Sequence, residues 1–205
     1  MSMILALATL RDDNVARVLA DPPLVWLVIA PDDPEPYEEA RRSSRPRSFV
    51  ARFFGRRSSP VEEQGTSHGL ELEEGEGLST DLDKSWHGLH YLLTGTAWEG
   101  EAPLNFLVSG GREVGKLDVG YGPVRVLTAG ETRAVRDALS KLDDDGLRAR
   151  FDGADMMKKQ IYPEIWDRPA EEDDPLGYLL EYAGVLRGFL SRAVDQEHGL
   201  VVYLS

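Results

Sequence analysis

Apolar residues between positions 176 and 194 recur every three to four residues, which is the spacing of one face of an α-helix. An acid at Asp173 or Asp174 precedes Pro175, and this pair is typical of a helix start. The carboxylate accepts N–H groups of the first turn, and proline suits that turn. The pattern predicts one long helix over residues 175–196.

Shorter patterns predict the other elements of the fold. Apolar and β-branched runs indicate strands at 3–10, 104–108, 112–117, 124–127 and 200–204. Capping residues before amphipathic segments indicate helices at 12–20, 128–142, 143–151 and 154–160. Residues 24–29 are β-branched but follow two prolines, so helix and strand both stay open there. Together these elements predict an α+β fold: a single compact domain with a small mixed or antiparallel sheet packed with several helices.

Residues 31–80 differ in composition from the rest of the chain. They contain five prolines together with many serine, glycine and charged residues. Such a segment buries little apolar surface. We therefore predict a partly mobile loop insert within a single domain that spans residues 1–205.

Residues 41–57 of this insert hold seven arginines and no acid, and aromatic residues recur among them at helical spacing. One interpretation is a short helix whose aromatic side chains dock on the domain while its arginines meet the acidic surface. The other is a basic amphipathic anchor for an anionic membrane or nucleic acid. This basic patch consists of Arg41, Arg42, Arg45, Arg47, Arg52, Arg56 and Arg57.

Residues 81–95 form the most distinctive local pattern, a predicted amphipathic helix with an aspartate cap at its start and a glycine at its end. At about 100° per residue, Asp83, His87 and His90 align on one stripe beside the apolar face. Two imidazoles and a carboxylate suit a divalent metal or acid–base catalysis. The alternative is structural. The histidines then lie at the edge of the core or on the surface, and Asp83 in the first turn is stabilised by the helix dipole.

A second aromatic segment lies at 161–166, where two aromatic residues and a carboxylate surround a proline turn. This combination suits the lining of a pocket. It is also typical of a plug that closes a core, with the polar tips of the rings at the water edge. The candidate residues for binding a ligand or partner are therefore Asp83, Trp86, His87, His90, Tyr162, Glu164 and Trp166.

Residues 110–116 have the spacing of a phosphate-binding P-loop and follow a predicted strand. Leu117 stands where that loop needs serine or threonine for magnesium. The glycines and proline at 120–123 also prevent the helix whose N-terminus supplies anion-binding N–H groups. We interpret this segment as a glycine turn, and we expect no nucleotide, no other cofactor and no bound metal.

Composition narrows the function classes further. The chain has no cysteine, which excludes disulfides and cysteine-ligated zinc and favours the reducing cytoplasm. Its net charge of −13 repels phosphate backbones, so nucleic acid is not expected as a partner. The apolar runs fall short of the roughly 20 residues of a transmembrane helix. The apolar start of the chain also lacks the basic leader of a signal peptide.

Several segments resemble one protein family. DLDKSWHGLHYLLTG at 81–95 is similar to the signature helix of the YfbM-like bacterial proteins, a domain of unknown function. GYGPVRVLTAGETRAVRDAL at 120–139 and ARFDGADMMKKQIYPEIW at 149–166 extend the resemblance, which continues to the last strand but omits the 31–80 insert. The resemblance implies a compact α+β fold in the bacterial cytoplasm, and it favours helix at 24–29. It brings no catalytic residue, substrate or cofactor.

Two hypotheses about function follow. The first is a non-enzymatic binding or protein-interaction domain, which would use the aromatic and histidine-bearing surface or the basic patch. An accessory or immunity-type role against another protein is compatible with the acidic charge. The alternative is a small enzyme or metal-dependent hydrolase that uses Asp83, His87 and His90. The sequence indicates neither the ligand nor the oligomeric state.

Overall fold

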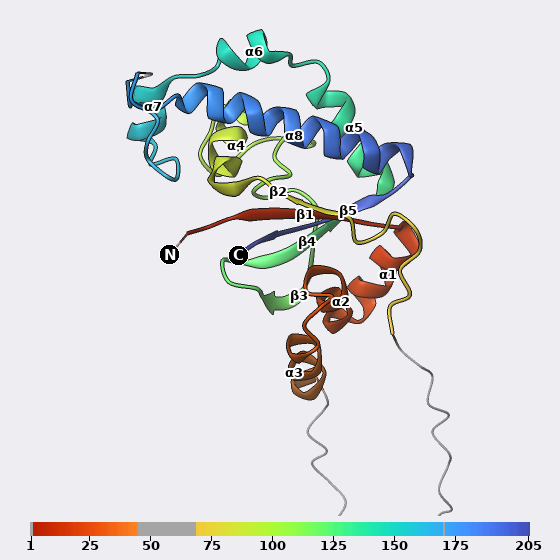
Figure 1. The fold of residues 1–205 in the computed structure, drawn as a ribbon. Coiled ribbons are helices and arrows are strands. Elements are labelled where there is room, and N and C mark those ends of the chain that lie inside the picture. Colours follow the sequence, from red (N-terminus) through yellow and green to blue (C-terminus); the bar gives the residue numbers. More distant parts are fainter. Residues whose placement is uncertain (1, 45–68, 170) are drawn as a thin grey trace, which may run out of the picture.

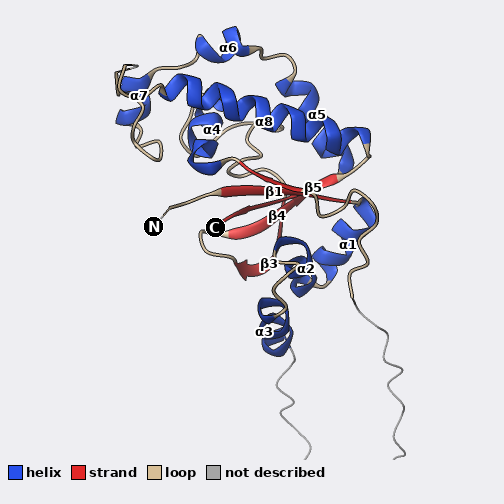
Figure 2. Cartoon of the chain, in the orientation of Figure 1, coloured by secondary structure: helices blue, strands red, loops and turns tan. Residues whose placement is uncertain are grey.

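A five-stranded antiparallel sheet lies between two layers of helices (Figure 1). The computed structural model describes residues 2–44, 69–169 and 171–205. The strand order is β2-β1-β5-β4-β3, so the first and last strands of the chain pair at the centre of the sheet. The predicted class, a single α+β domain, is confirmed. Figure 2 shows the same three layers coloured by secondary structure.

The sheet separates two apolar cores because side chains alternate between its faces. On β1, Leu5 and Leu7 point into one core, and Ala8 and Leu10 point into the other. All four side chains are buried. The strands are β1 (Leu5–Leu10), β2 (Ser79–Asp81), β3 (Arg112–Asp118), β4 (Pro123–Leu127) and β5 (Gly199–Leu204).

One helical layer follows β1 directly and covers one face of the sheet (Figure 1). It consists of α1 (Asp12–Ala20), a 3₁₀ turn (Pro22–Val25), α2 (Trp26–Ile29) and α3 (Glu35–Ser44). Residues 24–29 are thus helical, as the family resemblance favours. The 3₁₀ turn supplies Leu24 and Val25 to the core between this layer and the sheet.

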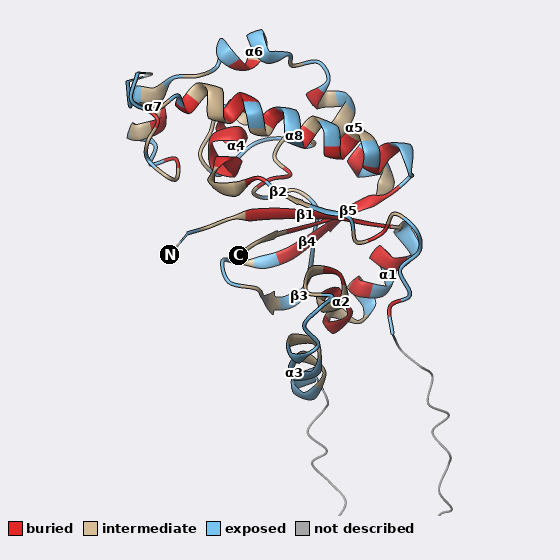
Figure 3. Cartoon of the chain, viewed as in Figure 1, coloured by how far each residue is buried: buried red, intermediate tan, exposed pale blue. Residues whose placement is uncertain are grey.

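The loop prediction was wrong for α3, which lies inside the 31–80 segment. This helix buries none of its ten residues, as Figure 3 shows, so no apolar stripe marks it in the sequence. Its anchor is polar. Arg41 Nη1 donates to Asp21 over 2.8 Å, and its guanidinium lies 5.6 Å from the ring centre of Tyr37. An ion pair to a residue 20 positions earlier in the chain can therefore anchor a helix that periodicity does not reveal.

The other helical layer covers the opposite face of the sheet (Figure 1). The predicted capping box is present, because Thr128 accepts from Glu131 N–H and Glu131 accepts from Thr128 N–H. Asp174 accepts from Gly177 N–H and starts the long C-terminal helix. The layer consists of α4 (Trp86–Thr94), α5 (Ala129–Leu139), α6 (Asp144–Arg148), α7 (Gly153–Lys158) and α8 (Pro175–Asp195).

The predicted strand at 104–108 is wrong, because this segment is a series of turns. The N–H groups of Val108, Ser109 and Gly110 all donate to the carbonyl oxygen of Asn105, which curls the backbone. Phe106 and Leu107 still point into the core, and their burial explains the apolar run. The short strand β2, by contrast, carries only polar side chains, and the loop prediction for residues 31–80 was wrong there as well.

Gly88 lies where α4 packs against α8, and its missing side chain is required there. A Cβ at Gly88 would lie 2.7 Å from Leu179 Cδ2 and from Trp166 Cη2, both on buried side chains. Alanine in a helix otherwise gains up to about 1 kcal/mol over glycine, whereas overpacking a core costs about 1–3 kcal/mol. We therefore expect Gly88→Ala to lower the free energy of unfolding in urea by about 1–2 kcal/mol.

Gly184 and Gly188 on α8 serve as matched controls for this prediction. A Cβ at either position meets no atom within 4 Å in the described part of the chain. Their alanine variants are expected to gain about 0.4–1 kcal/mol from the smaller entropy of the unfolded chain. If Gly88→Ala is stabilised as much as these two, the close approach of α4 and α8 is not tight.

Candidate functional site

The helix with the histidine stripe, α4, is buried along almost its whole length. A 3₁₀ turn at Asp83–Ser85 leads into it, and Asp81 accepts from the Asp83 N–H over 3.0 Å. Gly95 ends it in the left-handed conformation, as the sequence predicts. Every residue from Trp86 to Leu93 is buried, so the polar side of the helix does not face solvent. The 95–111 segment and α8 supply partners for the polar side chains near it.

His87 is fully buried and both of its ring nitrogens are satisfied by backbone groups. Nε2 lies 2.8 Å from the carbonyl oxygen of Ala97, and Nδ1 accepts from the N–H of Tyr162 over 3.0 Å. This pattern requires a neutral ring with its proton on Nε2. Burial lowers the pKa of His87 to about 4, although the Ala97 carbonyl acts in the opposite direction. His87 is therefore uncharged at neutral pH.

His90 and Asp83 point to different neighbours. His90 Nε2 lies 2.9 Å from the carbonyl oxygen of Glu99, and burial lowers the pKa of this imidazole. Asp83 instead accepts from the Tyr178 hydroxyl on α8 over 2.9 Å. Burial raises the pKa of Tyr178, and its bond to Asp83 raises it further. The structure thus gives the three stripe residues separate partners and does not join them in one site.

Aromatic rings gather around His87. Its imidazole stacks on Trp86 with ring centres 4.8 Å apart, and Trp98 covers it at 4.4 Å. Tyr162 also stacks on Trp86, with ring centres 6.1 Å apart. Trp86 is buried, but the Trp98 side chain is 55% exposed. This cluster therefore holds one indole in contact with both solvent and the core.

The 161–166 segment closes the core beside this cluster. Trp166 is buried and donates from Nε1 to the carbonyl oxygen of Ile161 over 2.7 Å. The Tyr162 hydroxyl accepts from the Met3 N–H over 3.1 Å, which ties the segment to the start of the chain. Glu164 is exposed and has a left-handed backbone, with φ of 62°. The segment has the geometry of a plug.

A cavity of about 340 Å³ opens beside Trp98, and we name it the Trp98 pocket. It is lined by rings from four separate parts of the chain and by one cation and one carboxylate. These six residues are Trp86, Trp98, Tyr121, Tyr203, Arg125 and Glu113. Both Trp98 and Tyr121 are partly exposed at 55% and 37%, so the pocket presents aromatic surface to solvent.

Arg125 is a buried cation in the wall of this pocket. Its guanidinium donates to the carbonyl oxygens of Phe106, Leu107 and Gly110 at 2.7, 2.8 and 2.5 Å. Burial lowers its pKa to about 10, while Glu113 raises it, so the group stays charged at neutral pH. The three bonds fix the 104–110 turns and with them one side of the pocket.

Sequence reasoning missed Trp98, Tyr121 and Arg125. A tryptophan and a tyrosine in glycine-bearing turns are signals for a surface with a binding role, because loops carry function and exposed aromatics are unusual. No sequence pattern indicates that these turns meet, because the three residues come from different segments. Nothing in the sequence around Arg125 indicates that its side chain is buried.

Only two residues of the basic patch lie within the described residues. Arg41 pairs with Asp21, and Arg42 Nε donates to the carbonyl oxygen of Glu38 over 3.2 Å. Arg45, Arg47, Arg52, Arg56 and Arg57 lie outside the described residues. Within the described ranges, no three His, Asp or Glu side chains are arranged to hold a metal ion. No described helix is long and apolar enough to cross a membrane.

Comparison with known proteins agrees with the fold. A family model described as a domain of unknown function (DUF1877) matches residues 1–203. The chain belongs to this family. The crystal structure of a protein of unknown function, YfbM from Escherichia coli, is similar to this DUF1877 domain, with 18% identity and a TM-score of 0.61 over 98% of this chain and 99% of that one. This likeness shows the fold alone and confirms the resemblance predicted from the sequence. No curated protein matches the chain.

Proposed function

We propose that this protein is a non-enzymatic binding domain whose partner inserts an aromatic or aliphatic group into the Trp98 pocket. The observation that carries the proposal is the half-exposed Trp98 ring, which is held 4.4 Å from the fully buried His87. An anchored indole offers a large contact area at little cost in conformational entropy. Residues of this kind dominate binding energies at interfaces.

The charges around the pocket indicate the chemistry of the partner. Glu113 lines the pocket with an exposed side chain, and its charge raises the pKa of Arg125 in the same wall. The chain as a whole carries a net charge of −13. Both features favour a partner that is basic around its inserted group, because complementary charge speeds association and selects among partners. An accessory or immunity-type role against a basic protein is compatible with this surface.

The enzyme alternative has less support from the geometry. His87 is bonded to the backbone at both nitrogens, His90 is buried, and Asp83 is engaged by Tyr178. A general acid or base must reach a proton of its substrate within about 3 Å. A metal-dependent hydrolase would also require converging ligands, which these three residues do not form among the described residues.

The test uses N-acetyl-tryptophanamide as a stand-in for a partner's aromatic side chain. At roughly 0.3 kcal/mol per heavy atom, we expect a dissociation constant of about 0.1–1 mM. In two-dimensional NMR, the shifts should concentrate on the Trp98 indole N–H and on the backbone of 107–111 and 121. Trp98→Ala should weaken binding about tenfold or more, whereas Leu78→Ala, at a 49% exposed leucine outside the pocket, should leave it unchanged. Shifts spread evenly over the surface, or equal binding by Trp98→Ala, would refute the proposal.

A further inference from the structure

Two charged side chains line the Trp98 pocket, and solvent reaches them to different extents. Glu113 on β3 pairs with Arg125 on β4 in the register of the sheet, and both side chains line the pocket. Glu113 is exposed, whereas Arg125 is only 9% exposed. Among the described residues, no other charged side chain lines the pocket. A charged group that enters from solvent therefore meets the carboxylate before it meets the guanidinium.

The positive charge of Arg125 is already matched by the backbone. Its guanidinium donates to three carbonyl oxygens of the 104–110 turns at 2.7, 2.8 and 2.5 Å. The negative ends of three carbonyl dipoles thus lie against the guanidinium and offset its charge. The carboxylate of Glu113 remains as the accessible charge of the pocket. The net charge of −13 on the whole chain also attracts a cation to it.

Aromatic surface lies in the same pocket as this carboxylate. Trp98 and Tyr121 are 55% and 37% exposed. The indole of Trp98 is supported from within, because its ring centre lies 4.4 Å from that of His87 and 6.4 Å from that of Trp86. The face of an aromatic ring attracts a cation that lies within about 6 Å of its centre. Rings and carboxylate together therefore favour a cationic ligand.

The remaining lining of the pocket indicates which cation fits. Aliphatic side chains complete the wall, namely Leu5, Leu107, Val108 and Leu204. An arginine side chain has an aliphatic stem for such a wall and a planar cation that stacks on a ring and pairs with a carboxylate. A leucine or phenylalanine would leave Glu113 without an opposite charge, and the compact ammonium of lysine has no plane to stack. The cavity of about 340 Å³ is large enough for one such side chain.

We propose, resting on the function proposed above, that the group which the partner inserts into the Trp98 pocket is an arginine side chain. Its aliphatic stem packs on the apolar wall, and its guanidinium stacks on Trp98 and pairs with Glu113. A single residue of the partner then supplies both the apolar contact and the positive charge that the pocket favours.

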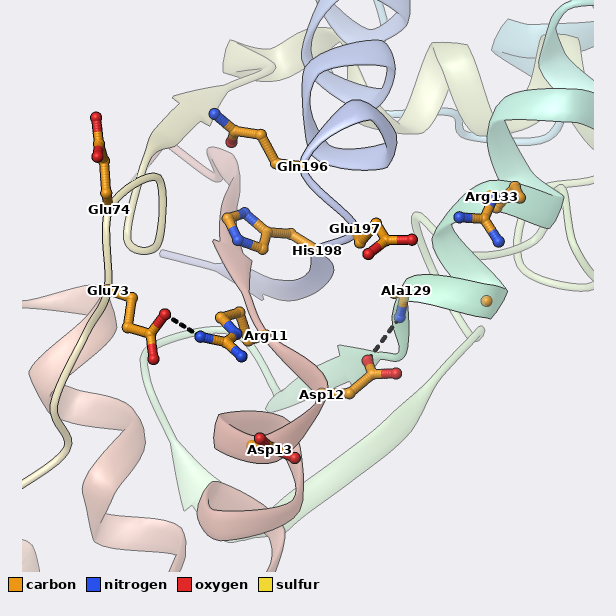
Figure 4. A pocket seen from close by; sticks show the side chains of 11 residues that line it. Arg11, Asp12, Asp13, Glu73, Glu74, Ala129, Arg133, Gln196, Glu197 and His198 are labelled. Atoms are coloured by element: carbon orange, nitrogen blue, oxygen red, sulfur yellow. Dashed lines mark hydrogen bonds and ion pairs between the residues drawn. The ribbon is translucent and has the colours of Figure 1, made fainter.

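A second and larger cavity, of about 610 Å³, provides an internal comparison (Figure 4). Five carboxylates and two guanidinium groups line it, but no described tryptophan, tyrosine or phenylalanine does. Two of these carboxylates have partners, because Glu73 pairs with Arg11 and Asp12 accepts from the Ala129 N–H over 2.7 Å, as Figure 4 shows. A cation that is attracted by charge alone would bind here as well as in the Trp98 pocket.

The test is a two-dimensional NMR titration of the full chain with N-acetyl-argininamide, at an ionic strength of about 0.02 M, where screening is weak. We expect a dissociation constant of about 1 mM and shifts concentrated on the Trp98 indole N–H. N-acetyl-citrullinamide has nearly the same shape without the charge, and it should bind about tenfold more weakly. N-acetyl-lysinamide keeps the charge without the plane, and it should bind about threefold more weakly than the arginine ligand.

Two exposed carboxylates supply the matched variants. Glu113→Gln should reduce the preference for the arginine ligand over the citrulline ligand to about threefold, because only the ring contact remains. Glu74→Gln, in the cavity of Figure 4, should bind both ligands as the original chain does. An equal loss in Glu74→Gln, or shifts centred on residues 129–133 and 196–198, would mean that charge alone attracts the ligand and would overturn the proposal.

The ligands also separate this proposal from the proposed function on which it rests. If N-acetyl-tryptophanamide binds at Trp98 but the arginine and citrulline ligands bind equally, the pocket takes an apolar group and the arginine proposal is wrong. If neither N-acetyl-tryptophanamide nor N-acetyl-argininamide shifts the Trp98 indole, the proposed function is wrong as well.

Discussion

Replacing Arg125 with Met is expected to lower the free energy of unfolding by about 3–5 kcal/mol, the range for breaking a buried charged contact. The guanidinium donates to three backbone carbonyls, two of them on the buried residues Phe106 and Leu107. Methionine fills a similar volume but donates no hydrogen bond. Each buried carbonyl left without a donor costs about 1–3 kcal/mol. Urea unfolding followed by circular dichroism measures the change.

Two other substitutions separate this effect from the loss of an arginine in general. Arg112 lies on the neighbouring strand, is half-exposed and reaches Glu131 only at 3.8 Å. Arg112→Met should therefore change stability by less than about 1 kcal/mol. Arg125→Lys keeps the charge but loses the planar fork, so its stability should be intermediate. If Arg125→Met and Arg112→Met are equally stable, the 104–110 turns do not depend on the guanidinium.

The role of Arg125 also shows why part of the fold could not be predicted from the sequence. Where local signals agree with tertiary packing, prediction succeeded, as at the Thr128 capping box and the long helix α8. At 104–108 the apolar run indicates burial correctly but not backbone conformation. The backbone carbonyls of Phe106 and Leu107 accept hydrogen bonds from the Arg125 side chain, about 20 residues later in the chain. No local sequence pattern indicates such a contact.

The candidate site shows the same limit. Helical periodicity places Asp83, His87 and His90 on one stripe, and α4 does form, but a period cannot tell which polar face a loop will cover. The backbone carbonyls of Ala97 and Glu99 fill that role here. Trp98 lies between these two residues, so the turn that covers the histidines also presents the aromatic ring of the pocket. Burial of His87 and exposure of Trp98 are therefore linked features of one turn.

This link predicts a strong dependence of stability on acid. The folded chain holds the pKa of His87 at about 4 because of burial, whereas an unfolded histidine titrates near 6.5. Between these values the unfolded state binds more protons than the native state, so stability falls as pH falls from about 6.5 to 4. At about 1.4 kcal/mol per unit of pKa, the full loss from His87 is about 3 kcal/mol. The lowered pKa of His90 acts in the same direction.

Urea unfolding at a series of pH values from 7.5 to about 4 measures this loss, and His87→Gln provides the comparison. The glutamine variant should be less stable at neutral pH, because it loses the stacking on Trp86 and the two-sided backbone contact. Its stability should nevertheless fall less steeply with acid, since position 87 no longer takes up a proton. NMR titration of the His87 ring gives a direct second readout. A midpoint near 6.5, or an unchanged acid slope in His87→Gln, would mean that the turn at 96–99 opens readily and does not hold Trp98 in place.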